Sequence, residues 1–197
     1  MSFRYSCLLG SLAVFCFAAC AGVRAQDLRF ELDPANTKIE FTLAASLHTV
    51  HGSFALENGS IHLNPATGSA SGSVVVDVKS GQSGNNMRDH KMHKEILQSE
   101  QYPEATFTPT KMSGAFREQG SSTIQIDGSF RIHGSDHPIA LTVPLQINGD
   151  SVSFTSQVAI PYQQWGMRNP SSFVLRVSDK VDLDIAATGH FFRDRYP

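Results

Sequence analysis

The sequence predicts an all-β protein with one short helix, folded as an eight-stranded antiparallel β-barrel. Apolar and polar residues alternate with a period of two in segments that recur between residues 38 and 187. This alternation is typical of strands that have one dry face and one wet face. One helical pattern, between Asn86 and Leu97, interrupts the series. The regular spacing of the strands and the single inserted helix favour a barrel over a sandwich.

The first 25 residues are expected to be a secretory signal peptide. Arg4 supplies a positive charge, residues 8–19 form a short apolar run, and residues 23–25 end in a small residue. The apolar run is too short to span a bilayer, and no later stretch is apolar enough for a membrane helix. We therefore divide the chain into a leader, residues 1–25, and one barrel domain, residues 26–197, which is expected to lie in the periplasm.

The three cysteines, Cys7, Cys16 and Cys20, all lie within this leader. A processed chain would therefore have no thiol, which excludes disulfide scaffolds, thiolate zinc sites and cysteine nucleophiles. Residues 17–20 loosely resemble a bacterial lipoprotein box, so anchoring through a lipidated Cys20 is a minor alternative. The net charge of −2 and the lack of a basic stripe argue against nucleic acid as a partner.

The strands are expected where apolar side chains keep one parity, around residues 39–43, 74–78, 105–108, 141–147, 152–160 and 181–187. Turn signals separate them at Asn58-Gly59, Asn64-Pro65, Asp127-Gly128 and Asn148-Gly149-Asp150. The tail from His190 to Pro197 mixes aromatic and charged residues and is expected to be loosely attached.

The helix is expected to begin at Asn86, which can cap it, with Asp89 three residues later near the positive helix end. Met92 and Ile96 are four residues apart, so they share a face that can plug a barrel mouth. Tyr102-Pro103 ends the helical segment, because a residue before proline is pushed towards extended geometry.

Four sequence blocks occur in an order that points to a known family. They are DPANTKIEF (33–41), TVHGSF (49–54), NMRD followed by YPEATF (86–89 and 102–107), and GSFRIHG followed by HPI (128–134 and 137–139). Together they resemble the YceI-like family of bacterial, lipocalin-like, polyisoprenoid-binding proteins, over roughly Phe30 to Gly189. The resemblance implies a ligand-holding barrel with the helix near one end.

Two departures from the family pattern leave the ligand open. Residues 45–49 replace a His-Leu-Gly stretch that the family usually carries, and residues 160–171 read like one subgroup of the family. We predict a non-catalytic carrier without cofactor or metal, which binds an elongated apolar molecule such as a polyisoprenoid or a fatty-acid derivative. A homodimer is left open.

The expected ligand-binding residues are of two kinds. Aromatic and methionine side chains at inward-capable positions would line the interior, namely Phe41, Phe54, Met92, Phe107, Phe130, Trp165 and Met167. Arg88 and Asp89 would anchor a polar head group at the mouth, since a guanidinium can make two parallel hydrogen bonds to phosphate or carboxylate. Their alternative role is to cap the helix and pin it to the barrel rim.

Two other functional classes stay open. Asp89, His90 and His93 lie close together in the sequence and suggest a metal-binding protein or an enzyme, although no HExxH motif or set of four ligands at known intervals accompanies them. A ligand-free periplasmic interaction module is the third class.

Overall fold

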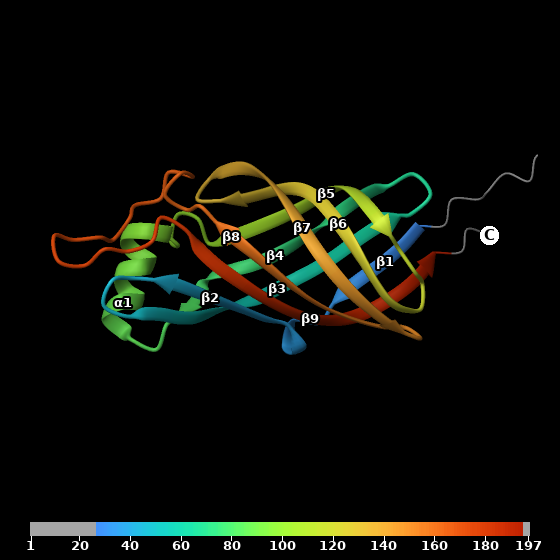
Figure 1. Ribbon diagram of the computed structural model, residues 1–197, viewed down its shortest axis with the longest axis horizontal. Helices are drawn as coiled ribbons and strands as arrows, with labels where there is room; N and C mark the ends of the chain where they lie inside the picture. The colour runs from blue at the N-terminus through green and yellow to red at the C-terminus, as the bar shows by residue number, and fades with distance from the viewer. Residues whose placement is uncertain (1–26, 195–197) are drawn as a thin grey trace, which may run out of the picture.

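The computed structural model describes residues 27–194, which form one antiparallel sheet of nine strands rolled into a barrel (Figure 1). The strands are β1 Asp27–Leu32, β2 Lys38–Ala44, β3 Thr49–Asn64, β4 Ser69–Gln82, β5 Glu104–Ala115, β6 Gly120–Ile132, β7 Ser135–Asn148, β8 Ser151–Ile160 and β9 Val181–Asp194. The helical segments are η1 Pro34–Asn36, α1 Asn86–Lys91 and η2 Met92–Leu97. Within residues 27–194, no helix is long and apolar enough to cross a membrane.

The barrel has eight strand positions, because β1 and β2 share one of them. β1 pairs with residues 60–63 of β3 and with the last part of β9, and β2 pairs with residues 49–54 of β3 and with an earlier part of β9. Between β1 and β2, Asp33 caps the short turn η1 by accepting from the Ala35 N–H at 2.9 Å. Pairing of β3 with β4 closes the barrel, so the predicted eight-stranded architecture is confirmed.

Two of the four predicted turns are wrong. Asn58-Gly59 lies inside β3 and Asp127-Gly128 lies inside β6, each beside a shift in strand register. A Cβ atom on Gly128 would lie 2.4 Å from the Thr108 carbonyl oxygen and 2.7 Å from the Phe107 ring. These glycines therefore mark irregular pairing and close approach within strands. The other two turn signals do join strands, β3 to β4 and β7 to β8.

Substituting Gly128 with alanine is expected to lower the free energy of unfolding by about 1–3 kcal/mol, because the added methyl group overpacks the strand against Thr108 and Phe107. Urea denaturation measures the change. The matched control is Thr123→Ala on the exposed face of the same strand, which is expected to stay within about 0.5 kcal/mol of the wild type. A Gly128→Ala protein as stable as this control would contradict the close approach.

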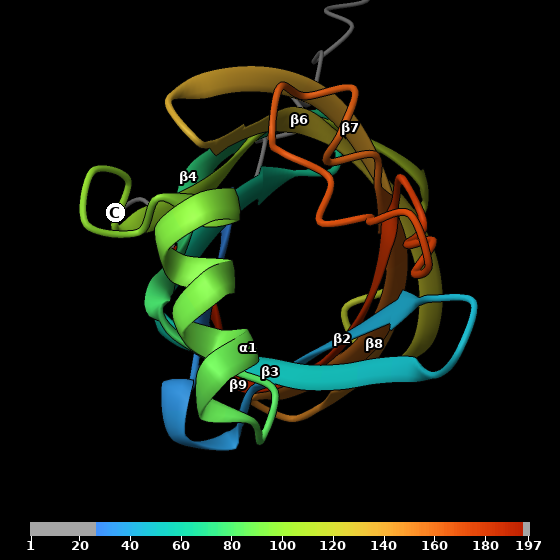
Figure 2. The same ribbon diagram turned by 90° about the vertical axis from the view of Figure 1, so that its left-hand side faces the viewer.

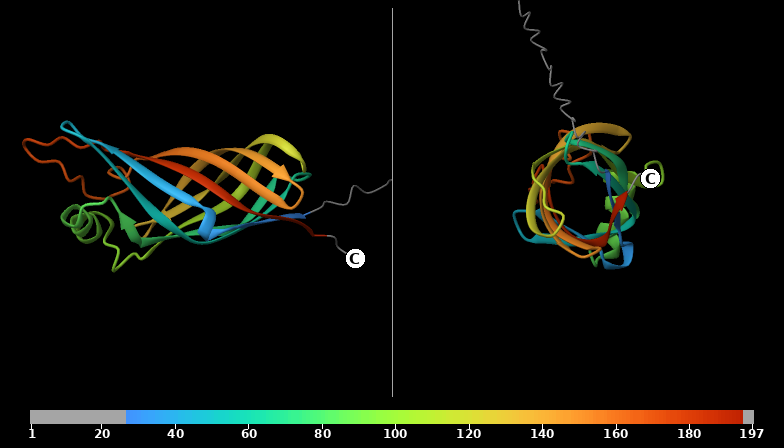
Figure 3. Two further views of the ribbon diagram at one scale, coloured as in Figure 1. Left: turned by 90° about the horizontal axis from the view of Figure 1, so that it is seen from below. Right: turned by 90° about the vertical axis from the view of Figure 1, so that its right-hand side faces the viewer.

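Residues 190–194 are not loosely attached, contrary to the prediction, and the rest of the predicted tail lies outside the described residues. β9 continues to Asp194, and its residues Gly189–Asp194 pair with all of β1. The Phe191 side chain is only 1% exposed, and its ring lies 5.1 Å from that of Phe30 and 6.5 Å from that of Phe116. These three rings close one end of the barrel, which we call the closed end. Both described ends of the chain lie there (Figures 1 and 3).

The helical segment lies across the opposite end of the barrel, which we call the α1 end (Figure 2). Its cap is Asn85, whose side-chain oxygen accepts from the Arg88 N–H at 3.1 Å, so the expected cap at Asn86 is wrong by one residue. The helix widens to π geometry in η2 and ends at Gln98, which has a left-handed φ of 48°. The expected signal peptide lies outside the described residues.

Candidate ligand-binding site

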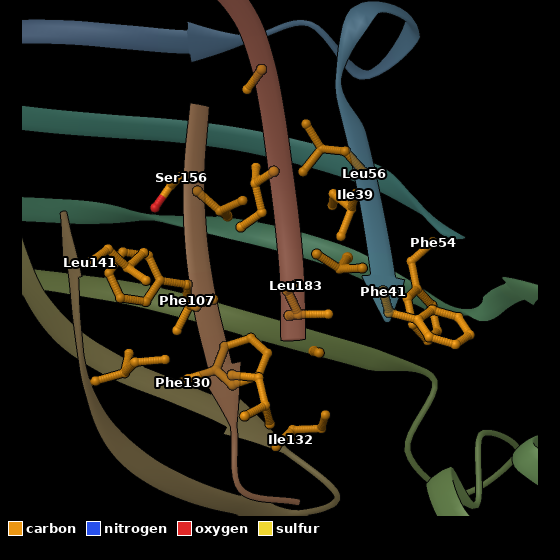
Figure 4. Close-up of a pocket in the computed structure, with 18 of the residues that line it drawn as sticks. Ile39, Phe41, Phe54, Leu56, Phe107, Phe130, Ile132, Leu141, Ser156 and Leu183 are labelled. Carbon is orange, nitrogen blue, oxygen red and sulfur yellow. The ribbon is translucent and has the colours of Figure 1, made fainter. Parts of the chain in front are cut away.

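The barrel encloses a cavity of about 240 Å³, which we call the bore (Figure 4). All nine strands contribute side chains to its wall, and none of the lining residues is charged. Three lining residues carry a hydroxyl group, namely Thr37, Ser156 and Tyr162. The Ser156 hydroxyl donates to the Thr142 carbonyl at 2.9 Å, and the Tyr162 hydroxyl donates to the Ser178 carbonyl at 2.6 Å. A guest inside the bore is therefore held mainly by burial of apolar surface.

The two ends of the bore differ. At the closed end the wall merges with fully buried side chains such as Ile124 and Val152, each 1% exposed. At the α1 end the wall is completed by Met92 and Ile96 of η2 and by Pro170 of the β8–β9 loop, all of them half-buried. We therefore place the mouth of the bore at the α1 end.

Six of the predicted ligand-binding residues line the bore: Phe41, Phe54, Met92, Phe107, Phe130 and Met167. They come from four different strands, η2 and the β8–β9 loop, so the fold gathers residues that are far apart in the sequence. The rings of the first two pack with their centroids 5.4 Å apart at the edge of the cavity (Figure 4). Their contact with a ligand stays a prediction.

Trp165 does not line the bore. Its ring stacks on that of His137, with centroids 4.2 Å apart and planes 4° apart, and it lies 6.1 Å from the Phe130 ring. The indole thereby packs the β8–β9 loop against the start of β7. The indole also packs against the buried cluster of Ile160, Tyr162 and Met167, which line the bore as Phe130 does.

Arg88 and Asp89 also lie outside the wall of the bore, and their role as a head-group anchor at its mouth stays a prediction. Both hold Ser83, which precedes the helix. The Arg88 guanidinium donates to the Ser83 hydroxyl oxygen at 2.7 Å and to its carbonyl at 2.8 Å. The Asp89 carboxylate accepts from the Ser83 N–H at 2.9 Å and from its hydroxyl. This geometry matches the alternative that we left open, in which the pair fastens the helix to the barrel.

The histidines of the helical segment are not arranged around a common centre. His93 has both ring nitrogens within hydrogen-bonding distance of protein groups, the Ser99 hydroxyl at 3.0 Å and the Gly81 carbonyl at 2.8 Å. His90 is exposed. Among the described residues, no group of three or more histidine, cysteine or acidic side chains is placed to hold a metal ion.

Sequence reasoning missed Tyr162, which anchors the β8–β9 loop beside the bore. Tyr162 is 6% exposed, and its hydroxyl donates a hydrogen bond to the Ser178 carbonyl on the other side of the loop. Burial raises the pKa of the Tyr162 phenol to about 12, and the nearby Asp179 carboxylate adds to the rise. A tyrosine directly after a strand and a proline was the available signal, but this pattern has no specific meaning by itself.

Alkaline pH is expected to destabilise the protein through Tyr162. Because the folded pKa exceeds the ordinary value of 10, the neutral phenol adds stability that is fully present below pH 10. This stability is lost as pH rises from about 10 towards 12. Urea denaturation between pH 8 and pH 12 should show a smaller loss for Tyr162→Phe than for the wild type. Parallel curves for the two proteins would contradict the assignment.

In a comparison with known protein families, residues 30–189 of the sequence match the YceI-like domain. The chain belongs to the YceI-like family. The match covers nearly all of the barrel, from β1 to β9, and confirms the resemblance found in the four sequence blocks. No curated protein matches the chain in a sequence comparison.

Solved structures show the same YceI-like fold at low sequence identity. BcnA of Burkholderia cenocepacia is 19% identical, with a TM-score of 0.65, over 80% of this chain and 98% of BcnA. A polyisoprenoid-binding domain from Saccharophagus degradans, implicated in plant cell wall breakdown, is 16% identical, with a TM-score of 0.65, over 82% of this chain and 97% of that domain. The Campylobacter jejuni YceI protein is 19% identical, with a TM-score of 0.50, over 74% of this chain and 82% of that protein.

Proposed function

We propose that this YceI-like protein is a non-catalytic carrier that holds an elongated apolar molecule, such as a polyisoprenoid or a fatty-acid derivative, in the bore. The observation that carries the proposal is a cavity inside the barrel with no charged residue in its wall. A similar barrel from Saccharophagus degradans is described as polyisoprenoid-binding, which agrees with this class of ligand.

The geometry favours a guest that lies along the barrel with its polar end at the mouth. Burial of apolar surface contributes about 25 cal/mol per Å² before the cost of ordering the ligand. A charged head group inside the bore would meet no opposite charge and would lose its hydration. We therefore assign the apolar tail to the bore and the head group to the α1 end.

The rival metal or enzyme site at Asp89, His90 and His93 has less support. The Asp89 carboxylate is occupied by Ser83, and the ring of His93 is held between Gly81 and Ser99. We propose that the carrier acts in the periplasm, on the basis of the signal-peptide pattern in residues 1–25.

The proposal is tested by native mass spectrometry and lipid extraction of protein purified from its own host. We expect one amphiphile per chain, which denaturing conditions release. As a second arm, ligand-free protein is titrated with cis-parinaric acid, a fatty acid that fluoresces when it enters an apolar site. Protein that arrives empty and does not increase the fluorescence of this probe would contradict the carrier function.

A further inference from the structure

Large apolar side chains are exposed around the mouth of the bore. Phe173 is 98% exposed, Met87 84%, Val174 73% and Leu47 71%. They come from three segments, residues 45–48 between β2 and β3, residues 86–97 of α1 and η2, and residues 170–180 of the β8–β9 loop. These segments surround the α1 end (Figures 2 and 3), and we call them together the rim.

Backbone hydrogen bonds join two of the rim segments at their bases. The Ser46 N–H donates to the Arg176 carbonyl at 2.8 Å, and the Ser178 N–H donates to the Ala44 carbonyl at 2.9 Å. A β-bridge between Ala45 and Val177 lies between these two contacts. The backbone therefore fixes the bases of both loops, while the side chains at their tips remain in solvent. Exposed apolar groups on a fixed support are typical of an interaction surface.

The charge of the rim is opposite in sign to that of the whole chain. The three segments contain five cationic residues and three acidic ones, whereas the full sequence has 16 Lys and Arg against 18 Asp and Glu. Two of the three acids are already engaged, Asp89 by Ser83 and Glu95 by Arg168 at 2.9 Å. The exposed cations are Lys91, Lys94, Arg176 and Lys180, whereas the fifth cation, Arg88, is half-buried and is itself held by Ser83.

We propose that the rim docks on the surface of an anionic lipid bilayer. The apolar tips would enter the boundary between head groups and acyl chains, and the cations would face lipid phosphates. The exposed apolar side chains lie on separate segments around the mouth and do not form one continuous patch. A deformable bilayer can contact all of them at once, which a preformed protein groove does less well. The wall of the bore continues into the rim through Pro170 and Met92, so a docked barrel would open towards the acyl chains. Docking itself does not depend on what the bore carries.

Flotation with vesicles tests the proposal on protein that exporting cells have processed, so that wild type and variants share one N-terminus. The vesicles contain phosphatidylcholine and phosphatidylglycerol in a ratio of about 7:3, compared with phosphatidylcholine alone. The variant combines Leu47→Ser, Met87→Gln and Phe173→Ser, all at exposed positions. Phe192→Ser is the matched control, because this phenylalanine is 36% exposed but lies at the closed end.

We expect the wild type and the Phe192→Ser control to float with the anionic vesicles. The triple variant should lose at least about tenfold in vesicle affinity, and the wild type should bind neutral vesicles more weakly. A wild type that does not float, or a triple variant that floats equally well, would overturn the proposal. The proposal would also be overturned if no protein floats, the wild type is a dimer in light scattering, and the triple variant is a monomer. Flotation of a protein that arrives empty and does not bind cis-parinaric acid would contradict the carrier function but leave this docking intact.

Discussion

Replacing Phe191 with alanine is expected to lower the free energy of unfolding by about 3–5 kcal/mol, the largest single effect that we foresee for stability. The side chain is 1% exposed and packs against Phe30 and Phe116 at the closed end. Its removal leaves a cavity beside the rings of Phe30 and Phe116 at the closed end. Urea denaturation followed by circular dichroism measures the change.

The adjacent Phe192 is the control for this experiment. It has the same side chain on the same strand but is 36% exposed, with the Arg29 guanidinium 4.7 Å from its ring centroid. Phe192→Ala is expected to cost about 1 kcal/mol or less. Equal losses for the two variants would contradict the closed end described above.

Replacing Leu183 with tryptophan is expected to weaken binding of cis-parinaric acid by at least about tenfold, which corresponds to about 1.4 kcal/mol. Leu183 lies on β9 and points into the bore among Phe41, Phe107 and Phe130 (Figure 4). An indole at this position fills space that the guest needs. Fluorescence titration gives the dissociation constant of each protein.

Ala186→Trp separates the loss of cavity from other effects of the new side chain. Ala186 lies three residues further along β9, on the exposed outer face. The control is expected to bind the probe as the wild type does, and thermal unfolding should show that both variants fold cooperatively. Wild-type affinity in a folded Leu183→Trp protein would mean that the probe binds outside the bore.

The alternation of apolar and polar residues predicted the strands, and their regular spacing with one inserted helix favoured a barrel over a sandwich. A period of two fixes which face of each strand is apolar, and antiparallel strands with one apolar face close around a common interior. The same logic placed Phe41, Phe107 and Phe130 in the wall of the bore. What alternation does not encode is whether the interior is filled, because a void depends on how side chains from all strands meet.

The errors come from residues whose role depends on distant partners. Asn58-Gly59 has the composition of a turn, yet Gly59 faces Leu32, where an added Cβ would lie 2.8 Å from a methyl carbon. Asp127-Gly128 is misread for the same reason. The segment after His190 has no strong alternation, and it becomes a strand because β1 pairs with it. The position of the Arg88 side chain is set by its hydrogen bond to Ser83, and the spacing of these two residues in the sequence does not predict that contact.

The meeting of β1 and β9, with Asp27 opposite Asp194, has a practical consequence. A fusion partner, an affinity tag or a covalent link to a sensor chip can be joined next to Asp27 or Asp194 without covering the mouth. Surface-immobilised protein would then present the α1 end outward to flowing vesicles or dissolved lipid. One orientation on the chip would therefore allow binding into the bore and docking through the rim to be recorded on the same molecules.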